Sequence, residues 1–436
     1  MKCKMQFPNQ LRRSVGPILV LALMLAGLRA AAQTETVLHN LAATSQQTSG
    51  LVRDSAGNLY GTTQNGGLYG FGTVFELSPP AAGSTVWTTK TIHVFGTSTT
   101  DGQYPSSPNL IFDSAGNLYG TTSQGGAFGG GTVFELSLQT AGGWAEKILY
   151  RFGTGTGPNY PTGVVFDGAG NLYGTAGGGL YGRGTVFELS PKTGGGWGVK
   201  TLHNFGGGPK DGISPIGNLV IDGAGNIYGV TYMGGAHTAS AVGGTVFELS
   251  PPAAGRTYWL ETILHSFGVG LNVPAGDGWD PVAGLVMDGA GNLYGTTFNG
   301  GIYDTANTGG TVFEVSPVPG GGWTETVLHN FSENNIDGFW PCGSLTLDSA
   351  GNLYGTASAG GSAVDSSVYL YGVAFELSPP AAGSTAWTET ILHPFGARKD
   401  GQYPTSNLIF DDAGNLFGTT NRGGTLGGGV VFEVTP

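Results

Sequence analysis

One short string recurs seven times along the chain, and it constrains the fold more than any other feature. Its first copy reads Gly-Asn-Leu-Tyr-Gly-Thr-Thr over residues 57–63, and its asparagine returns at intervals of 54 to 66 residues. Units of this length are typical of four-stranded propeller blades. The seven asparagines are Asn58, Asn117, Asn171, Asn226, Asn292, Asn352 and Asn415.

Each unit predicts four short strands and no helix. In the second unit they cover residues 110–113, 117–122, 132–136 and 144–152, and the Asp and Gly of residues 113–116 favour a hairpin turn after the first. Both faces of the second strand carry apolar or small residues, whereas a one-sided sheet would show polar residues on one face. Burial on both faces is what a blade needs between two neighbours.

The two ends of the chain predict how the repeat array closes. The fourth-strand pattern, Trp-x-Glu-Thr-x-Leu-His-x-Phe at residues 387–395, has a copy at residues 35–41, before the first unit. The chain ends after a third strand, residues 430–434. The sequence therefore predicts an all-β, seven-bladed β-propeller over residues 33–436, with four antiparallel strands per blade. The N-terminal strand would be the outer strand of the last blade, which removes two free edges. A linear solenoid, the alternative, would leave that strand unused.

The first 32 residues have the pattern of a secretory signal peptide. Lys2, Lys4, Arg12 and Arg13 precede an apolar segment at residues 18–28, and Ala30-Ala31-Ala32 forms a cleavage site. We expect cleavage before Gln33 and a secreted, periplasmic or cell-surface protein. An uncleaved N-terminal anchor is the alternative. The apolar segment is short for a membrane span of about 20 residues, so no span is expected after cleavage.

Charge and cysteine content limit the partners and the sources of stability. Residues 33–436 contain 12 basic and 29 acidic residues, a net charge of −17. This balance disfavours nucleic acid and anionic membranes as partners, because both attract clustered Lys and Arg. Cys342 is the only cysteine after the leader, so no intrachain disulfide is expected. We expect a monomer that is stabilised by packing.

The repeat resembles a known bacterial family. The segments Gly50-Leu51-Val52-Arg53-Asp54, residues 58–63 and residues 72–77 are similar to the GloVer tandem repeat, and the similarity extends over residues 34–436. Members of that family share the repeats and differ in their surface-anchoring ends. The resemblance implies an extracytoplasmic protein and brings no established activity. This chain differs in showing no recognisable anchor at its C-terminal end.

Two sets of polar residues recur with the repeat and have simple structural interpretations. Six histidines occupy one repeated position, so they lie about a blade apart and cannot converge on one metal ion; hydrogen bonding on the outer strands is expected. The aspartates that precede the repeated Gly-Asn, such as Asp54, are expected to form turns. A calcium loop is the alternative there, although each turn supplies few acids. We predict no metal site and no cofactor. The histidines are His39, His93, His203, His265, His329 and His393.

The loops between fourth and first strands are the candidate ligand-binding segments. They read Asp-Gly-x-aromatic-Pro or a close variant, and all should emerge on one face of the ring. Aromatic rings can stack on sugars, and carboxylates can bind sugar hydroxyls. The alternative is structural: Asp-Gly starts a turn, Pro ends it, and the aromatic ring fills the junction between blades. The candidates are Asp101, Tyr104, Tyr160, Asp277, Trp279, Asp280, Asp337, Trp340, Asp400 and Tyr403.

Departures from the repeat add three further candidates. The loops between second and third strands are longest in units four to six, and they contain His237, Asp304 and Asp365. Long loops on a rigid scaffold are common places for binding sites. Drift of tolerated loop sequence is the alternative interpretation.

The sequence favours binding over catalysis. Propeller enzymes need a cluster of titratable residues at the channel, and the predicted inner strands are nearly all apolar, as in Leu110-Ile111-Phe112. We therefore expect a secreted, non-catalytic propeller whose loop face binds a polysaccharide or a cell-surface protein. One alternative is a polysaccharide lyase, glycosidase or lactonase-like enzyme, with a carboxylate pair from Asp280, Asp304 or Asp365. Another is a structural component of the cell surface.

Overall fold

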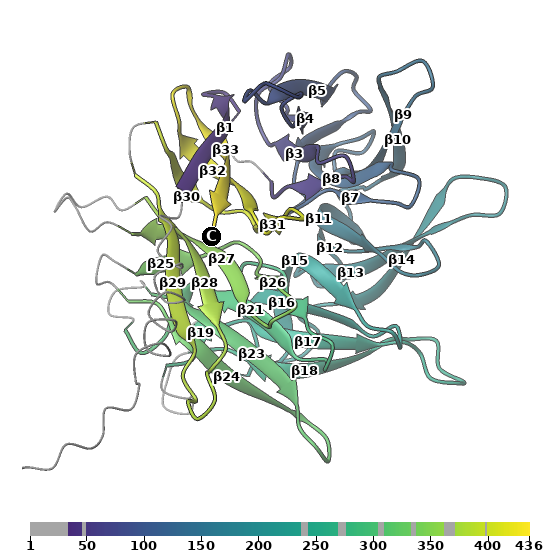
Figure 1. Ribbon diagram of the computed structural model, residues 1–436. Coiled ribbons are helices and arrows are strands. Elements are labelled where there is room, and N and C mark those ends of the chain that lie inside the picture. Colours follow the sequence, from purple (N-terminus) through teal and green to yellow (C-terminus); the bar gives the residue numbers. More distant parts are fainter. Residues whose placement is uncertain are drawn as a thin grey trace, which may run out of the picture.

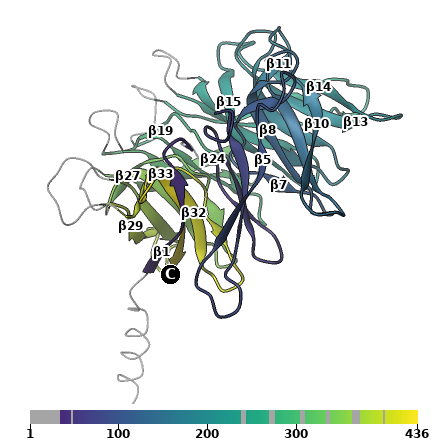
Figure 2. The ribbon, with the colours of Figure 1, turned by 90° about the horizontal axis from the view of Figure 1, so that it is seen from above.

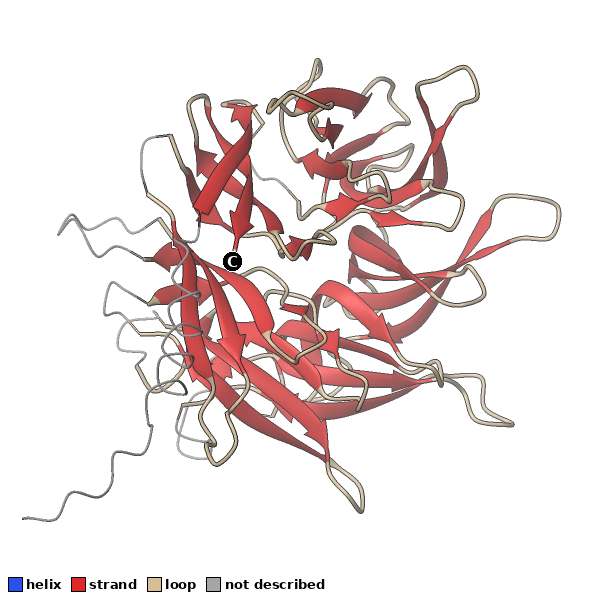
Figure 3. Cartoon of the chain, in the orientation of Figure 1, coloured by secondary structure: helices blue, strands red, loops and turns tan. Residues whose placement is uncertain are grey.

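The computed structural model describes residues 34–45, 49–236, 243–268, 276–303, 309–332, 337–361, 371–396 and 399–436. Seven blades surround a common axis, which confirms the predicted all-β propeller (Figures 1 and 3). The described segments consist of strands and turns, so none of them supplies a helix that could cross a membrane.

Each blade is an antiparallel sheet whose strands run outward in chain order, except that in the last blade the N-terminal strand is outermost. The first three blades consist of β2 (Val52–Arg53), β3 (Leu59–Thr63), β4 (Thr73–Ser78) and β5 (Thr88–Val94); β6 (Gly102–Pro105), β7 (Ile111–Phe112), β8 (Leu118–Gly125), β9 (Thr132–Leu138) and β10 (Trp144–Arg151); and β11 (Pro158–Phe166), β12 (Leu172–Gly178), β13 (Thr185–Pro191) and β14 (Trp197–Asn204).

The remaining blades repeat this plan, and several inner strands are split into two short pieces. The fourth and fifth blades consist of β15 (Gly212–Ile221), β16 (Ile227–Gly234), β17 (Thr245–Ser250) and β18 (Leu260–Ser266); and β19 (Gly278–Trp279), β20 (Val286–Met287), β21 (Leu293–Thr297), β22 (Asn299–Gly300), β23 (Thr311–Pro317) and β24 (Trp323–Asn330). The last two consist of β25 (Gly338–Pro341), β26 (Thr346–Leu347), β27 (Leu353–Gly360), β28 (Val373–Ser378) and β29 (Thr388–Pro394); and β30 (Gly401–Pro404), β31 (Ile409–Phe410), β32 (Leu416–Gly423), β33 (Gly427–Thr435) and β1 (Thr34–Ala42).

The two ends of the chain close the ring in one sheet. Strand β1 pairs antiparallel with β33, with Glu35 opposite Val434 and His39 opposite Val431. Figures 1 and 2 show β1 beside β33. The predicted closure is confirmed. Its physical cause is the pairing of two strand edges that would otherwise expose their backbone groups.

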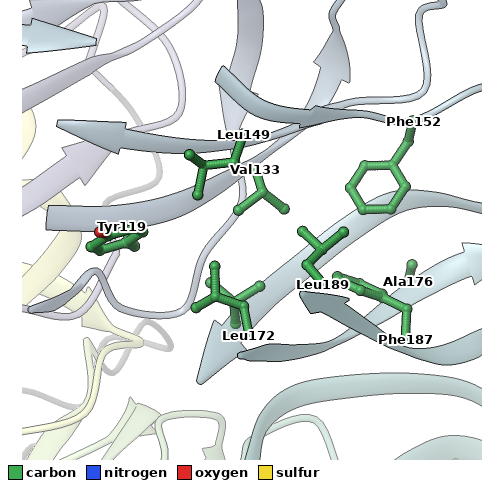
Figure 4. Close-up of a cluster of buried hydrophobic side chains, with 9 residues drawn as sticks. Tyr119, Val133, Leu149, Phe152, Leu172, Ala176, Phe187 and Leu189 are labelled. Carbon is green, nitrogen blue, oxygen red and sulfur yellow. The ribbon is translucent and has the colours of Figure 1, made fainter. Parts of the chain in front are cut away.

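Phenylalanine pairs form the contacts between neighbouring blades. The third strand of each blade carries a buried Phe, such as Phe134 and Phe187. In the first six blades the segment after the fourth strand carries another, such as Phe95 and Phe152, and Leu41 takes that place in the last. Phe95 meets Phe134 of the next blade with ring centroids 5.2 Å apart, and Phe152 meets Phe187 at 5.1 Å. Figure 4 shows the second of these contacts within its cluster. Burying each ring contributes about 1.5–3 kcal/mol.

The repeated glycine of the second strand makes room for a ring in its own sheet. Gly61 is paired with Phe75, and a Cβ atom on Gly61 would lie 2.7 Å from the tip of that ring. The same distance is 2.7 Å for Gly120 and Phe134. The glycines therefore accommodate the aromatic ring of the adjacent strand.

Candidate binding face

Two kinds of loop lie together on one side of the ring, which we call the loop face. One kind joins the second and third strands of a blade, such as residues 64–72. The other leads from a fourth strand into the next blade, such as residues 95–105. The backbone N–H of Tyr104 donates to the Phe71 carbonyl, and that of Tyr403 donates to the Tyr371 carbonyl. Each entering loop is thus fastened to the preceding blade.

The residue before the loop proline has a left-handed backbone in each of the six entering loops that contain a proline. Its φ angle lies between 51° and 59° in Tyr104, Tyr160, Ser214, Asp280, Trp340 and Tyr403. This conformation is costly for a residue with a side chain, at about 1–3 kcal/mol, and a following proline disfavours it further. Surrounding contacts must therefore hold it in place. Strain of this kind clusters at binding and catalytic sites, so it singles out these positions.

The proline of each loop packs into a space that a glycine leaves in the preceding blade. A Cβ atom on Gly72 would lie 2.6 Å from Cδ of Pro105, and one on Gly184 would lie 2.2 Å from Cδ of Pro215. The N–H bond to the preceding blade and this proline contact together fix the strained residue. The backbone that carries the aromatic side chains is therefore rigid.

Three of the predicted aromatic side chains, Tyr104, Trp340 and Tyr403, are partly exposed and contact other aromatic rings. Tyr104 meets Phe71 edge-on at 5.5 Å, and Tyr403 lies 6.1 Å from Tyr371 with Arg422 over its ring. Trp340 stacks on Phe298, with centroids 5.6 Å apart and planes 6° from parallel.

Tyr160 is the most exposed of the predicted rings, at 45%, whereas Trp279 is buried. The neighbouring blade thus supplies a partner ring for Tyr104, Trp340 and Tyr403.

Exposed apolar side chains also lie at the tips of the second-to-third-strand loops. They follow the repeated Gly-Gly, and sequence reasoning did not identify them as a group. The recurring pairs Leu68-Tyr69 and Leu180-Tyr181 were a signal from which they could have been predicted. Large apolar residues exposed side by side are characteristic of interaction surfaces. The loop-tip residues are Leu68, Tyr69, Phe128, Leu180, Tyr181, Ile302, Tyr303 and Leu426.

The predicted aspartates lie beneath the loop face. Asp101, Asp277, Asp337 and Asp400 are buried. Asp101 accepts hydrogen bonds from the backbone N–H groups of Thr97 and Gly102, and thereby shapes its loop. The aromatic rings, and not these carboxylates, form the accessible part of the predicted site.

Asp280 differs from the other aspartates because it occupies the left-handed position itself. It is buried, it accepts a hydrogen bond from Asn299, and burial raises its pKa. His237, Asp304 and Asp365 lie outside the described residues, so the predicted site is placed only in part.

A cavity of about 270 Å³ occupies the axis of the ring. Side chains and backbone from the inner strands line it, among them Ser106, Asn109, Thr162 and Asn407. Cys342 is the one titratable side chain among the described lining residues, and burial raises its pKa to about 12. These residues offer hydrogen-bonding groups and no acid or base that ionises near neutral pH.

The turn aspartates are fully engaged by the protein. Asp54 accepts from the N–H groups of Ala56 and Asn58 with one oxygen, and from the Asn58 amide and the Tyr60 hydroxyl with the other. These hydrogen bonds lower its pKa against the opposing effect of burial. The pattern returns in every blade, with Phe417 in place of the tyrosine in the last. The geometry supports the turn-forming interpretation over a calcium loop.

Solved structures share the propeller fold at low sequence identity. Polysaccharide lyase Uly1 matches with a TM-score of 0.50 and 13% identity over 91% of this chain and 90% of its own. A luciferin-regenerating enzyme matches with a TM-score of 0.44 and 12% identity over 93% of this chain and 95% of its own. A gluconolactonase from Xanthomonas campestris matches with a TM-score of 0.40 and 12% identity over 76% of this chain and 88% of its own. Similarity at this level concerns the fold alone.

Sequence comparison points to one family. No curated protein sequence matches the chain. The model of the Gloeobacter/Verrucomicrobia repeat, by contrast, matches residues 27–243, 138–369 and 236–436, which together include all seven repeats. The chain belongs to the Gloeobacter/Verrucomicrobia repeat family.

Proposed function

We propose that this protein is a secreted, non-catalytic propeller that binds a polysaccharide on its loop face. The observation that carries the proposal is the repeated left-handed residue, which presents Tyr104, Tyr160, Trp340 and Tyr403 on a strained and anchored backbone. Rigid aromatic rings lose little conformational entropy on binding, and their apolar faces match the apolar faces of sugar rings.

The distribution of aromatic rings favours a polymer over a small ligand. The rings and the loop-tip residues recur from blade to blade around the loop face, so successive sugars of one chain can contact successive blades. Several weak contacts of this kind add through effective concentration. The described residues at the axial cavity carry no carboxylate or imidazole, which favours binding over hydrolysis or elimination.

The chain itself supplies a conservative substitution for the test. Ser214 occupies the left-handed position in the fourth blade, so replacement by serine keeps the backbone conformation and removes the ring. We suggest Tyr160→Ser, Trp340→Ser and Tyr403→Ser, singly and together. The control is Tyr258→Ser, because Tyr258 is 58% exposed on the loop before β18, at the opposite side of the ring.

Binding is measured on a polysaccharide array and then by calorimetry with the glycan that scores highest. Loss of one aromatic contact of about 0.5–1.5 kcal/mol lowers affinity about two- to tenfold. The triple variant should lose detectable binding, while the control binds and melts like the parent protein. Unchanged affinity of the triple variant would refute the proposed face, and cleavage of the glycan during incubation would refute the non-catalytic part.

A further inference from the structure

Histidine, aspartate and glutamate side chains meet at five of the boundaries between blades. The His lies on the fourth strand of one blade, the Asp on the loop that follows it, and the Glu on the fourth strand of the next blade. We call these groups the boundary triads. They are His93, Asp101 and Glu146; His203, Asp211 and Glu261; His265, Asp277 and Glu325; His329, Asp337 and Glu389; and His393, Asp400 and Glu35.

A β-bulge in every fourth strand makes the triads possible. In β24, Val327 is paired with Phe313, but His329 is paired with Val312, so Leu328 is the additional residue. Without this bulge, Glu325 and His329 would point to the same face, since side chains alternate along a strand. With it, Glu325 faces the preceding blade and His329 faces the following one. One strand thus contributes to two triads.

In four of the triads the distances from the histidine are longer than good hydrogen bonds, whereas in the fifth Nε2 of His393 lies 3.1 Å from Oδ2 of Asp400. The histidine Nε2 atom lies 3.4 Å from a carboxylate oxygen of Asp277 in one triad and 3.4 Å from Asp337 in another. It lies 3.5 Å from Glu146 and 3.6 Å from Glu261. N–H···O bonds are usually about 2.7–3.2 Å long. Donor atoms at the corners of a zinc tetrahedron, with bonds of about 2.0–2.1 Å, are about 3.3 Å apart.

The triads also contain buried polar atoms that form no hydrogen bond with the described residues. The Asp277 side chain is 1% exposed, and its Oδ2 atom has no hydrogen-bonding partner. The same is true of Oε1 of Glu325 in that triad. Buried polar atoms without partners are costly, and a bound ion is one of the few things that satisfies several at once.

Each triad places two carboxyl groups beside one imidazole. The protein therefore supplies too little positive charge for two ionised carboxylates at these places. A divalent cation would balance both charges.

The aspartate and histidine side chains are held in position by neighbouring groups. Oδ2 of Asp400 accepts from the backbone N–H of Gly396, and Oδ1 accepts from that of Gly401. The His393 ring packs edge-on against Phe395 at 4.7 Å. Fixed ligands with supporting contacts are typical of metal sites.

At each of the two boundaries without a triad, more than one of the three triad residues is replaced. Between the second and third blades, Tyr150, Gly157 and Val199 stand at the places of His, Asp and Glu. Between the last and first blades, His39 remains, but Thr89 replaces the Glu and bonds to Nδ1 of His39 at 2.9 Å, and no Asp follows in the loop. The residues thus vary as a unit within one chain, which is expected if they act as a unit.

We propose that each boundary triad binds one divalent transition-metal ion of the zinc class, through the histidine Nε2 atom and one oxygen of each carboxylate. All donor atoms of a triad lie within 4.8 Å of one another. The nitrogen donor favours Zn²⁺ over Ca²⁺ or Mg²⁺, which prefer oxygen. The six repeated histidines lie too far apart to share one ion, whereas each boundary triad would hold an ion of its own. The ions would link neighbouring blades at their outer strands.

The test is a count of bound metal. Protein stripped with a chelator is incubated with Zn²⁺, desalted and analysed by mass spectrometry for metal content, with Ca²⁺ and Mg²⁺ in parallel. We expect about five zinc ions per chain, as many as there are triads, and no retained calcium or magnesium. Substitution by Co²⁺ should give the visible absorption of four- or five-coordinate cobalt with nitrogen and oxygen ligands.

Variants assign the ions to the triads. Glu325→Gln keeps the shape of the side chain and removes its charge, so the count should fall by one. His39→Gln is the matched control, because His39 has the repeated position without the carboxylates, and its count should not change. If the parent protein retains no zinc, the proposal is overturned. Loss of an ion in the His39→Gln variant would also overturn it. The readout is independent of glycan binding, so the two proposals can fail separately.

Discussion

The contact between each loop proline and the preceding blade predicts a specific sensitivity to a single methyl group. Gly184 has a φ angle of +104°, and a Cβ atom there would lie 2.2 Å from Cδ and 2.9 Å from Cγ of Pro215 in the next blade. Gly194, in the turn before β14 of the same blade, has a φ angle of +95° and nothing within 4 Å of such an atom. The two sites share the backbone conformation and differ in the steric contact.

The expected magnitudes follow from that difference. Placing alanine at a positive φ costs about 1–3 kcal/mol at either site. At Gly184 the methyl group also forces the two blades apart, which adds about 1–3 kcal/mol. We therefore expect Gly184→Ala to lower the free energy of unfolding by about 2–6 kcal/mol and Gly194→Ala by about 1–3 kcal/mol. The effect of alanine on the unfolded chain is common to both and cancels in the comparison.

Urea unfolding, followed by tryptophan fluorescence, measures both values. Pro215→Ala removes the atoms that the new methyl group would strike, so in the double variant part of the loss from Gly184→Ala should be recovered. A coupling of about 1–3 kcal/mol is expected in this double-mutant cycle. Equal destabilisation by the two glycine substitutions would refute the argument that these contacts hold the blades together, as would additive effects in the cycle.

Three further predictions concern the turns and the closure of the ring. Tyr60→Phe removes the hydrogen bond to Asp54 and should cost about 1 kcal/mol in urea unfolding, whereas Phe417→Tyr supplies the missing hydroxyl to Asp411 and should not destabilise. The pKa values of the turn aspartates are lower in the folded protein than in the unfolded chain, so their ionised forms stabilise the fold at pH values above the unfolded pKa of about 4. This stabilisation is lost as the aspartates are protonated, so the melting temperature should drop as pH falls below about 4. A melting temperature that stays constant from about pH 5 to 2 would contradict this. A chain that lacks residues 34–42 should oligomerise through the exposed edge of β33, and a peptide of that sequence should restore the monomer in size-exclusion chromatography.

The repeat by itself determined the architecture of this protein. Seven copies of one unit set the number of blades, and the additional fourth-strand pattern at residues 35–41 set the way in which the ring closes. Local patterns sufficed because each unit contains its own turns and strands, and because a strand edge without a partner is unfavourable. The role of Asp54 and its copies was also predictable, since their hydrogen bonds stay within six residues of the chain.

Only the tertiary structure decided where the polar residues of the loops and fourth strands point. Alternation along a strand places Glu325 and His329 on one face, and the bulge at Leu328 separates them, a shift that depends on pairing with β23. The left-handed backbone of Tyr403 is likewise imposed by the preceding blade, against the local preference of a residue before proline. These features depend on contacts between neighbouring strands or neighbouring blades, whereas periodicity in a sequence reports only what each segment prefers alone. The sequence identified Asp101 and its copies as candidates. It did not predict that they are buried next to a histidine and a glutamate of two different blades, because contacts between blades are not visible in the periodicity of one segment.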